Sequence, residues 1–272
     1  MSNPQFDAQR RLVHLLTPEG MPRAMLLDLF TRVDLQRSAL LAPIEPEDVA
    51  ARGTQVGSAR IVTAFYVPHP SAQAGLTQAA RHRQWACSPV SQRLDAAHDH
   101  PATIAARCTP GDTLVLCHPA SGAAYAVAAC LSPGIHIINV ADGMHAAPIA
   151  ALCDMVQLWR RLPALHTRVI TLVGDLCTNA RLRCVIHMLT TLGVPQVSVV
   201  HASDVLPPGA ATLGAHVYGV SDAAGATVSA DVVMSYGEDL VFHGLPAAPA
   251  DEPHLAYAAV FLAVHDMLMG TA

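Results

Sequence analysis

The stretch "INVADGMHAAPIAALCDMVQLW" (residues 138–159) leads from an apolar strand through a turn into an amphipathic helix. The strand, "IHIINV" (135–140), has few polar positions, which is typical of a strand covered on both faces. Apolar residues then recur at helical spacing from Ile149 to Trp159, and Pro148 suits the first turn of a helix. A buried strand that feeds a helix is the repeating unit of an α/β fold.

Strands and helices alternate in the same way along the rest of the chain. Helices are predicted at 21–42, 71–85, 121–130, 148–161 and 254–269, and a further helix follows residue 175 and has Gly193 as its C-cap. Strands are predicted at 61–66, 113–117, 135–140, 168–175, 196–200 and 231–236. We predict an α/β protein of two domains, each with a mainly parallel sheet flanked by helices. The first domain takes residues 1–140 and a returning C-terminal helix at about 252–272, and the second takes residues 141–251.

Composition excludes several partners and several kinds of chemistry. The 272 residues are 52% hydrophobic with a net charge of −5, which predicts no nucleic-acid partner. All 16 basic side chains are arginine, so lysine chemistry is impossible within this chain. The apolar run "LAYAAVFLAV" (255–264) is too short to cross a bilayer, and no membrane partner is expected. Seven cysteines without a Cys-x-x-Cys pair, and a start without an apolar signal core, predict free thiols and a cytoplasmic protein.

Five segments stand out along the chain: "LCHPASGAA" (116–124), the stretch 138–159, "VGDLCTNARLRCVIHMLTTLG" (173–193), "DVVMSY" (231–236) and "HGLP" (243–246). In this order and spacing they resemble the aspartate/ornithine carbamoyltransferase family over about residues 20–270. The first is similar to the family's R-H-P-x-x-G-A, and the second to its N-A-G-D-G-x-x-x-H-P-T-Q-x-L-L-D. The resemblance implies a first domain of the carbamoyl-phosphate-binding type and a second of the amino-acid-binding type. It also implies a trimer with active sites between subunits, where a neighbour donates a lysine to the phosphate.

The charged residues that the resemblance would carry over are mostly absent. The family's phosphate loop, S-T-R-T-R, falls on Ser71-Ala72-Gln73-Ala74-Gly75, and the arginine of R-H-P falls on Cys117. The family's histidine and glutamine of the crossover segment fall on Ala147 and Ala150, and its second-domain arginine falls on Ala180, beside Arg181. Its late arginine falls near Gly237, and the donated lysine cannot exist. By contrast, residues that shape the backbone in the family's motifs, such as Pro119 and Gly143, are present in this sequence.

The residues at the expected ligand edge give a candidate site. Substrate-binding candidates are Ser71, Gln73, Cys117, His145, Arg181 and Leu245, and catalytic candidates are Cys117, His118 and His145. A cysteine near two histidines could be an activated nucleophile, or it could be a small residue filling the space of an arginine. No cofactor is expected. No metal site is assigned either, because "HDH" (98–100) offers two ligands but fits solvated loop histidines equally well.

Three functions remain open from the sequence. The first is a divergent homologue that has lost carbamoyl-phosphate binding and acts as a structural or regulatory partner, in a homotrimer or a mixed oligomer with a related subunit. The second is an enzyme repurposed for another small polar substrate in specialised metabolism. The third is carbamoyl transfer by an atypical site. A pocket that joins Gln73, Cys117, His145 and Arg181 favours the second function, and filled space between the domains favours the first.

Overall fold

The computed structural model describes residues 3–42, 59–89, 95–162, 164–237, 240–245 and 253–270. These residues form two five-stranded sheets, which confirms the predicted α/β class. The first sheet is parallel throughout and has the order β1 (His14–Leu15), β5 (His136–Asp142), β4 (Asp112–His118), β2 (Arg60–Phe65) and β3 (Ala86–Pro89). The second has the order β10 (Leu240–His243), β9 (Val232–Tyr236), β6 (Val169–Gly174), β7 (Gln196–His201) and β8 (His216–Tyr218), and β10 is its one antiparallel strand.

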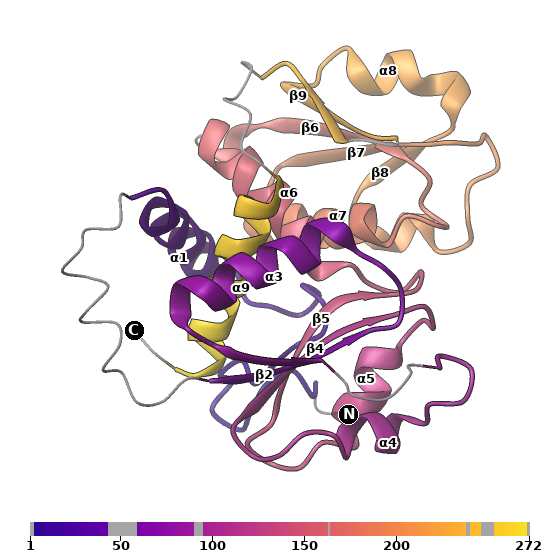
Figure 1. Cartoon of the computed structure of the whole chain (residues 1–272). Coiled ribbons are helices and arrows are strands. Elements are labelled where there is room, and N and C mark those ends of the chain that lie inside the picture. The colour runs from indigo at the N-terminus through magenta and orange to yellow at the C-terminus, as the bar shows by residue number, and fades with distance from the viewer. Residues whose placement is uncertain are drawn as a thin grey trace.

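Helices cover both sheets and fill the space between them (Figure 1). The α-helices are α1 (Arg23–Leu41), α3 (Pro70–Arg83), α4 (Pro101–Ala105), α5 (Ala123–Ala128), α6 (Pro148–Arg161), α7 (Ala180–Leu192), α8 (Ala223–Thr227) and α9 (Pro253–Leu268). Short 3-10 turns lie at Leu165–Thr167, Ala210–Leu213 and Val220–Asp222. In Figure 1, α8 lies over the outer side of the second sheet, α4 and α5 lie below the first, and α9 crosses the middle of the molecule.

The core is continuous from one sheet to the other. Every residue of β4 is buried, as expected of a central strand with both faces covered. One apolar cluster contains Ile61 of the first sheet, Ile170 of the second and most of α6 and α9. Each side chain from Ala258 to Val264 is fully buried, so α9 is a core helix that is apolar on all sides.

The C-terminal helix returns to the first half of the chain. Helix α9 packs against α1, α3 and α6. The strands of the first sheet end at Asp142 and those of the second begin at Val169, with α6 between them. The exact division into residues 1–140 with 252–272, and 141–251, stays a prediction. No helix among the described residues combines the length and the apolar character that a bilayer crossing requires.

Candidate functional site

The first turn of α3 carries Ser71 and Gln73, and the side chain of the residue before it caps the helix. His69 is the N-cap residue, and its Nδ1 accepts a hydrogen bond from the backbone N–H of Ala72 at 3.3 Å. In return, the backbone N–H of His69 donates to Oε1 of Gln73 at 3.3 Å. Burial lowers the pKa of His69, and the nearby Arg181 lowers it further. The imidazole is therefore neutral, and this helix N-terminus presents no added positive charge to an anion.

Gly75 lies where α3 packs tightly against α9. A Cβ at this position would lie 2.4 Å from Cβ of Tyr257, 2.9 Å from the backbone N of Ala258 and 2.9 Å from the carbonyl oxygen of His254. Two of these three atoms are backbone, so no side-chain rotation relieves the overlap. The position that the resemblance assigns to the second arginine of the phosphate loop therefore has no room for any side chain.

The thiol proposed as a nucleophile is buried at the end of β4. Cys117 is only 3% exposed, and burial raises the pKa of its thiol to about 11. It is therefore protonated at neutral pH, which is the opposite of an activated cysteine. The next residue, His118, is also buried, and its Nδ1 accepts a hydrogen bond from the backbone N–H of Ala120 at 3.0 Å. Its ring packs on Tyr66, with 4.6 Å between the ring centroids, and burial lowers its pKa.

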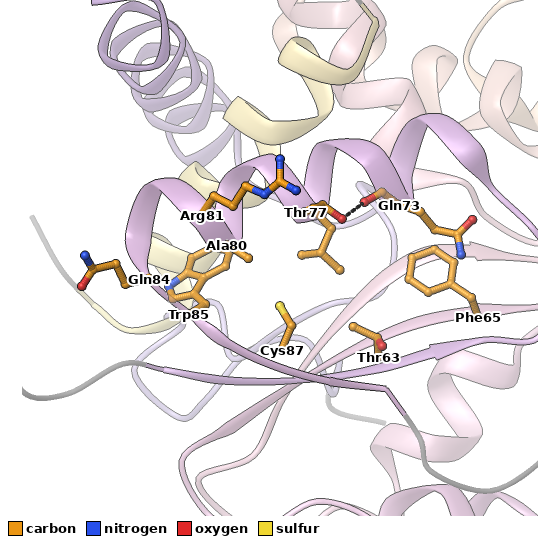
Figure 2. Close-up of a pocket in the computed structure, with 10 residues that line it drawn as sticks. Thr63, Phe65, Gln73, Thr77, Ala80, Arg81, Gln84, Trp85 and Cys87 are labelled. Carbon is orange, nitrogen blue, oxygen red and sulfur yellow. Dashed lines mark hydrogen bonds between the residues drawn. The ribbon is translucent and has the colours of Figure 1, made fainter. Parts of the chain in front are cut away.

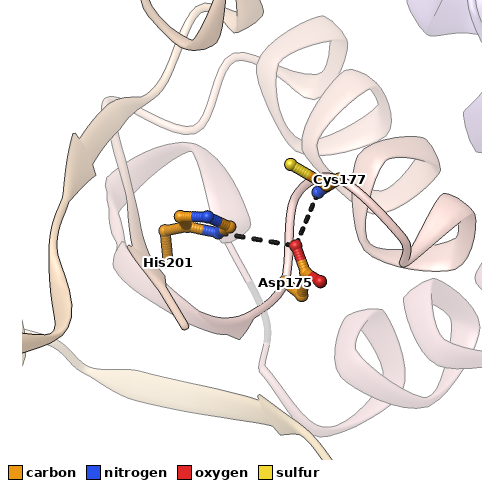
Figure 3. Close-up of side chains that lie close together, drawn as sticks. All are labelled: Asp175, Cys177 and His201. Carbon is orange, nitrogen blue, oxygen red and sulfur yellow. Dashed lines mark hydrogen bonds and ion pairs between the residues drawn. The ribbon is translucent and has the colours of Figure 1, made fainter. Parts of the chain in front are cut away.

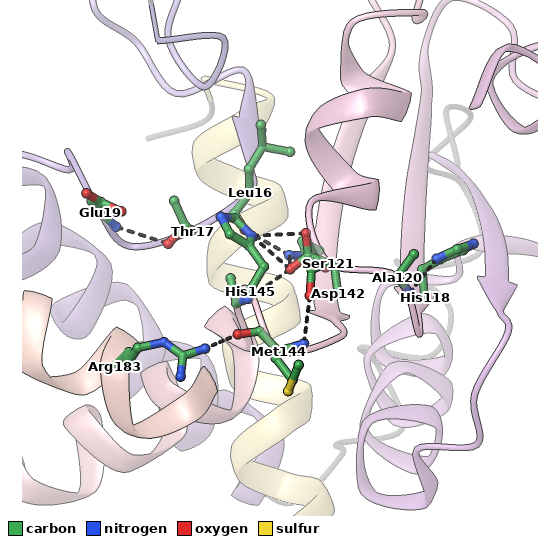
Figure 4. A network of polar contacts seen from close by, with 12 residues as sticks. Leu16, Thr17, Glu19, His118, Ala120, Ser121, Asp142, Met144, His145 and Arg183 are labelled. Atoms are coloured by element: carbon green, nitrogen blue, oxygen red, sulfur yellow. Dashed lines mark hydrogen bonds and ion pairs between the residues drawn. The ribbon is translucent and has the colours of Figure 1, made fainter. Parts of the chain in front are cut away.

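His145 belongs to a hydrogen-bonded turn after β5 (Figure 4). Its Nδ1 lies 3.1 Å from Oδ2 of Asp142, a fully buried carboxylate. Oδ1 of the same carboxylate accepts hydrogen bonds from the backbone N–H of Ala146 at 3.0 Å and from the amide of Asn139 at 3.1 Å. The hydrogen bond to Asp142 raises the pKa of His145. His145 thus holds the turn together, and its bonding nitrogen is engaged by Asp142 rather than by a neighbouring thiol.

Arg181 is a partly buried residue at the start of α7 and forms an ion pair with a buried carboxylate. Its Nε donates to Oδ2 of Asp154 at 2.6 Å, and its Nη2 donates to the other carboxylate oxygen. The hydroxyl of Tyr236 also donates to Asp154, at 3.3 Å, and the Arg181 guanidinium lies 5.8 Å from the centre of the Tyr236 ring. Burial alone would lower the pKa of Arg181, but the Asp154 carboxylate outweighs burial and raises it. Burial raises the pKa of Asp154, and Arg181 opposes that rise. Arg181 follows Ala180, the position where the family has its second-domain arginine, and its charge is neutralised by this bidentate pair with Asp154.

Arg183, two residues further along α7, joins the two halves of the protein. Its guanidinium donates to the carbonyl oxygens of Leu176 and Cys177 before α7, and to the carbonyl oxygen of Met144 after β5 (Figure 4). This side chain therefore ties the turn that follows the first sheet to the turn that follows β6. Both arginines of "NARLR" (179–183) serve internal contacts.

A separate cavity lies between α3 and strands β2 and β3 (Figure 2). Its volume is about 580 Å³. It is lined by Thr63, Phe65, Gln73, Leu76, Thr77, Ala80, Arg81, Gln84, Trp85 and Cys87. Gln73 is the one predicted substrate-binding residue in this lining. Cys117 and Arg181 are engaged elsewhere, as described above, and Leu245 packs against the main apolar cluster. Pro246 of the "HGLP" segment lies outside the described residues.

The paired histidines of "HDH" have separate local roles. His98 lies 2.9 Å from a carboxylate oxygen of Asp95, and His100 caps α4 by accepting a hydrogen bond from the backbone N–H of Ala102 at 3.3 Å. Sequence reasoning missed the cap made by His69, although a polar residue directly before Pro70 at a predicted helix start was a usable signal.

No protein-family model matches the sequence, but solved structures of aspartate transcarbamoylases have this arrangement. The enzyme of Trypanosoma cruzi in complex with carbamoyl aspartate and phosphate superposes with a TM-score of 0.63 at 16% identity, over 91% of this chain and 94% of that one. The catalytic subunit of M. jannaschii aspartate transcarbamoylase gives 0.62 at 14%, over 95% and 98%. The ligand-free T. cruzi enzyme gives 0.62 at 13%, over 95% and 97%. The chain therefore has the aspartate transcarbamoylase fold.

Proposed function

We propose that this chain is a divergent relative of the aspartate transcarbamoylases that does not use carbamoyl phosphate and serves as a structural or regulatory partner. The contact at Gly75 carries the proposal. There, α9 fills the space in which the resemblance would put a phosphate-binding arginine. The other expected cationic positions are Gln73, the buried Cys117 and Ala180, none of which carries a charge.

The free energies of the missing hydrogen bonds are large enough to abolish carbamoyl phosphate binding rather than only weaken it. A charge-assisted hydrogen bond to an anion contributes about 1.5–3 kcal/mol, so three missing partners remove at least ~4 kcal/mol. The N-terminus of α3 offers about 0.3–1 kcal/mol to an exposed anion, and its cap by His69 competes for that. Catalysis depends on the same groups, because positioned donors and cations stabilise the charge that develops in the transition state.

Phosphate release tests the proposal directly. The purified chain is incubated with carbamoyl phosphate and either aspartate or ornithine, and inorganic phosphate is measured against a protein-free control. We expect the two rates to be equal. Amino-acid-dependent release above the control would overturn the proposal and would support carbamoyl transfer by an atypical site, the third function that the sequence left open.

A structural or regulatory partner must assemble with other subunits, and we propose that this happens in the cytoplasm. All seven cysteines are free thiols, which is consistent with the cytoplasm. We infer a homotrimer, or a mixed oligomer with a catalytically complete related subunit. Light scattering after size exclusion, on the chain alone and mixed with such a subunit, checks this. A chain that elutes as a monomer under both conditions contradicts it.

The cavity beside α3 supports a second candidate, a repurposed binding protein or enzyme. Its 580 Å³ is within the usual range for small-molecule sites, and Arg81 and Gln73 lie in its lining with Phe65 and Trp85. A thermal-shift screen of small polar metabolites tests this. A true ligand at a hundred times its dissociation constant adds about 2.7 kcal/mol of stability, and Arg81→Gln should reduce the shift for an anionic ligand.

A further inference from the structure

Three side chains of metal-ligating types meet at the carboxyl ends of β6 and β7 (Figure 3). Asp175 directly follows β6, and His201 is the last residue of β7, where it pairs in register with Gly174. Cys177 lies in the turn between Asp175 and α7. One ligand atom from each of the three residues lies within 4.8 Å of the other two.

We propose that Asp175, Cys177 and His201 bind a divalent cation of the zinc class. A thiolate, an imidazole nitrogen and a carboxylate oxygen are the three donor types that zinc uses in proteins. In a tetrahedral zinc site the ligand atoms lie about 3.3–3.7 Å apart, as follows from metal–ligand bonds of about 2.0–2.3 Å. Nδ1 of His201 lies 3.7 Å from Oδ1 of Asp175, at the upper end of that range, and the Cys177 sulfur lies within 4.8 Å of a ligand atom of each.

The surroundings fix the turn but leave one side open. Arg183 donates to the carbonyls of Leu176 and Cys177, and the hydroxyl of Thr178 donates to Oδ2 of Asp175 at 2.7 Å. The imidazole of His201 is buried, whereas Cys177 is exposed. Two protein ligands on a fixed turn and a third at the end of β7, with the exposed Cys177 on one side, correspond to a zinc site that keeps a water molecule.

Binding has a cost that can be compared with its gain. The backbone N–H of Leu176 donates to Nδ1 of His201 at 3.2 Å, and an ion at this nitrogen displaces that bond. One neutral hydrogen bond is worth far less than the stabilisation that a structural zinc ion gives to a small domain. The Cys177 thiol must also release its proton to solvent, so affinity should rise with pH.

The competing interpretation is a turn held by hydrogen bonds alone. Oδ1 of Asp175 accepts a hydrogen bond from the backbone N–H of Cys177 at 2.7 Å, which would stabilise the turn without an ion. The two interpretations differ in what happens to the thiol. A bound cation protects the Cys177 sulfur from alkylation, and a hydrogen-bonded turn leaves it reactive.

Native alkylation with iodoacetamide, followed by peptide mass spectrometry, separates the two. The full chain, purified without a metal-binding tag and treated with a chelator, is alkylated with and without micromolar zinc. Cys130 is also exposed and serves as the internal control. We expect zinc to slow modification of Cys177 by at least about tenfold and to leave Cys130 unchanged, and Asp175→Asn to require about ten times more zinc for the same protection.

Cobalt gives a second readout that does not depend on reactivity. Cobalt bound at this site should show a thiolate-to-metal charge-transfer band that is absent in Cys177→Ser, a substitution at an exposed position that leaves the fold intact. Equal alkylation of Cys177 with and without zinc, equal protection of Cys130, or a band that persists in Cys177→Ser would each overturn the proposal. The test is independent of carbamoyl phosphate and of the proposed function.

Discussion

Replacement of Gly75 by alanine tests the contact on which the proposed function depends. The new Cβ would lie 2.4 Å from Cβ of Tyr257 and 2.9 Å from two backbone atoms of α9, all closer than real Cβ contacts come. Helices α3 and α9 must therefore move apart. Overpacking of this kind costs up to about 3 kcal/mol, and the better helix propensity of alanine returns about 1 kcal/mol. We expect a net loss of roughly 2 kcal/mol in the free energy of unfolding.

A second helical glycine provides the matched control. Gly225 lies in α8, and a Cβ added there would meet nothing within 4 Å. Gly225→Ala should therefore be neutral or stabilising by up to about 1 kcal/mol. Urea denaturation gives both values, and a net loss of 2 kcal/mol should lower the midpoint of thermal unfolding by about 4–8 °C. If Gly75→Ala is as stable as the native chain, α9 does not fill this space, and the argument against a phosphate-binding residue there fails.

Three further predictions concern buried groups. Burial lowers the pKa of His14 and of His265 to about 4. Because the unfolded chain binds a proton at each imidazole more tightly than the folded chain, the free energy of unfolding should fall by up to about 3 kcal/mol for each as the pH drops from 6.5 to 4. Equal stability at pH 7 and pH 4.5 would contradict this. Asp154→Asn leaves the partly buried guanidinium of Arg181 without its anion and should lower the free energy of unfolding in urea by about 3 kcal/mol. The control Asp28→Asn breaks an exposed pair with Arg32 on one helix and should cost at most about 0.5 kcal/mol. Similar losses in both variants would refute the role of burial. Cys117 should stay unmodified by iodoacetamide in the folded protein while exposed thiols react, and rapid alkylation there would reopen its role as a nucleophile.

The sequence predicted the elements that carry strong apolar patterns. Helix α6 begins at Pro148 and ends at Arg161, as expected, because its apolar periodicity and its first-turn proline both mark it. Gly193 ends α7 in a left-handed conformation, with a φ of 79°, which fits its predicted capping role. Strand β3, "ACSP", was missed because it is a largely exposed edge strand without an apolar pattern. Strand β10 was missed because it depends on antiparallel pairing with β9 rather than on its own composition.

The candidate site was harder to predict because its contacts join distant parts of the chain. The sequence shows which charges are missing, since Gln73, Gly75 and Cys117 can be read directly from the resemblance. It does not show that Tyr257 fills the space beside Gly75, or that Asp154 binds the guanidinium of Arg181. The contacts of Gly75 with Tyr257 and of Asp154 with Arg181 depend on how helices α3, α6, α7 and α9 pack. Helix packing cannot be read from any local sequence pattern.

Calorimetric titration with carbamoyl phosphate tests the central claim most directly, because it measures binding without requiring a reaction. A micromolar site that loses about 4 kcal/mol becomes a millimolar one. We therefore expect no saturable heat at submillimolar concentrations of the ligand. Stoichiometric binding with a micromolar dissociation constant would contradict the account, because the described residues at these positions provide no uncommitted cation to hold the phosphate.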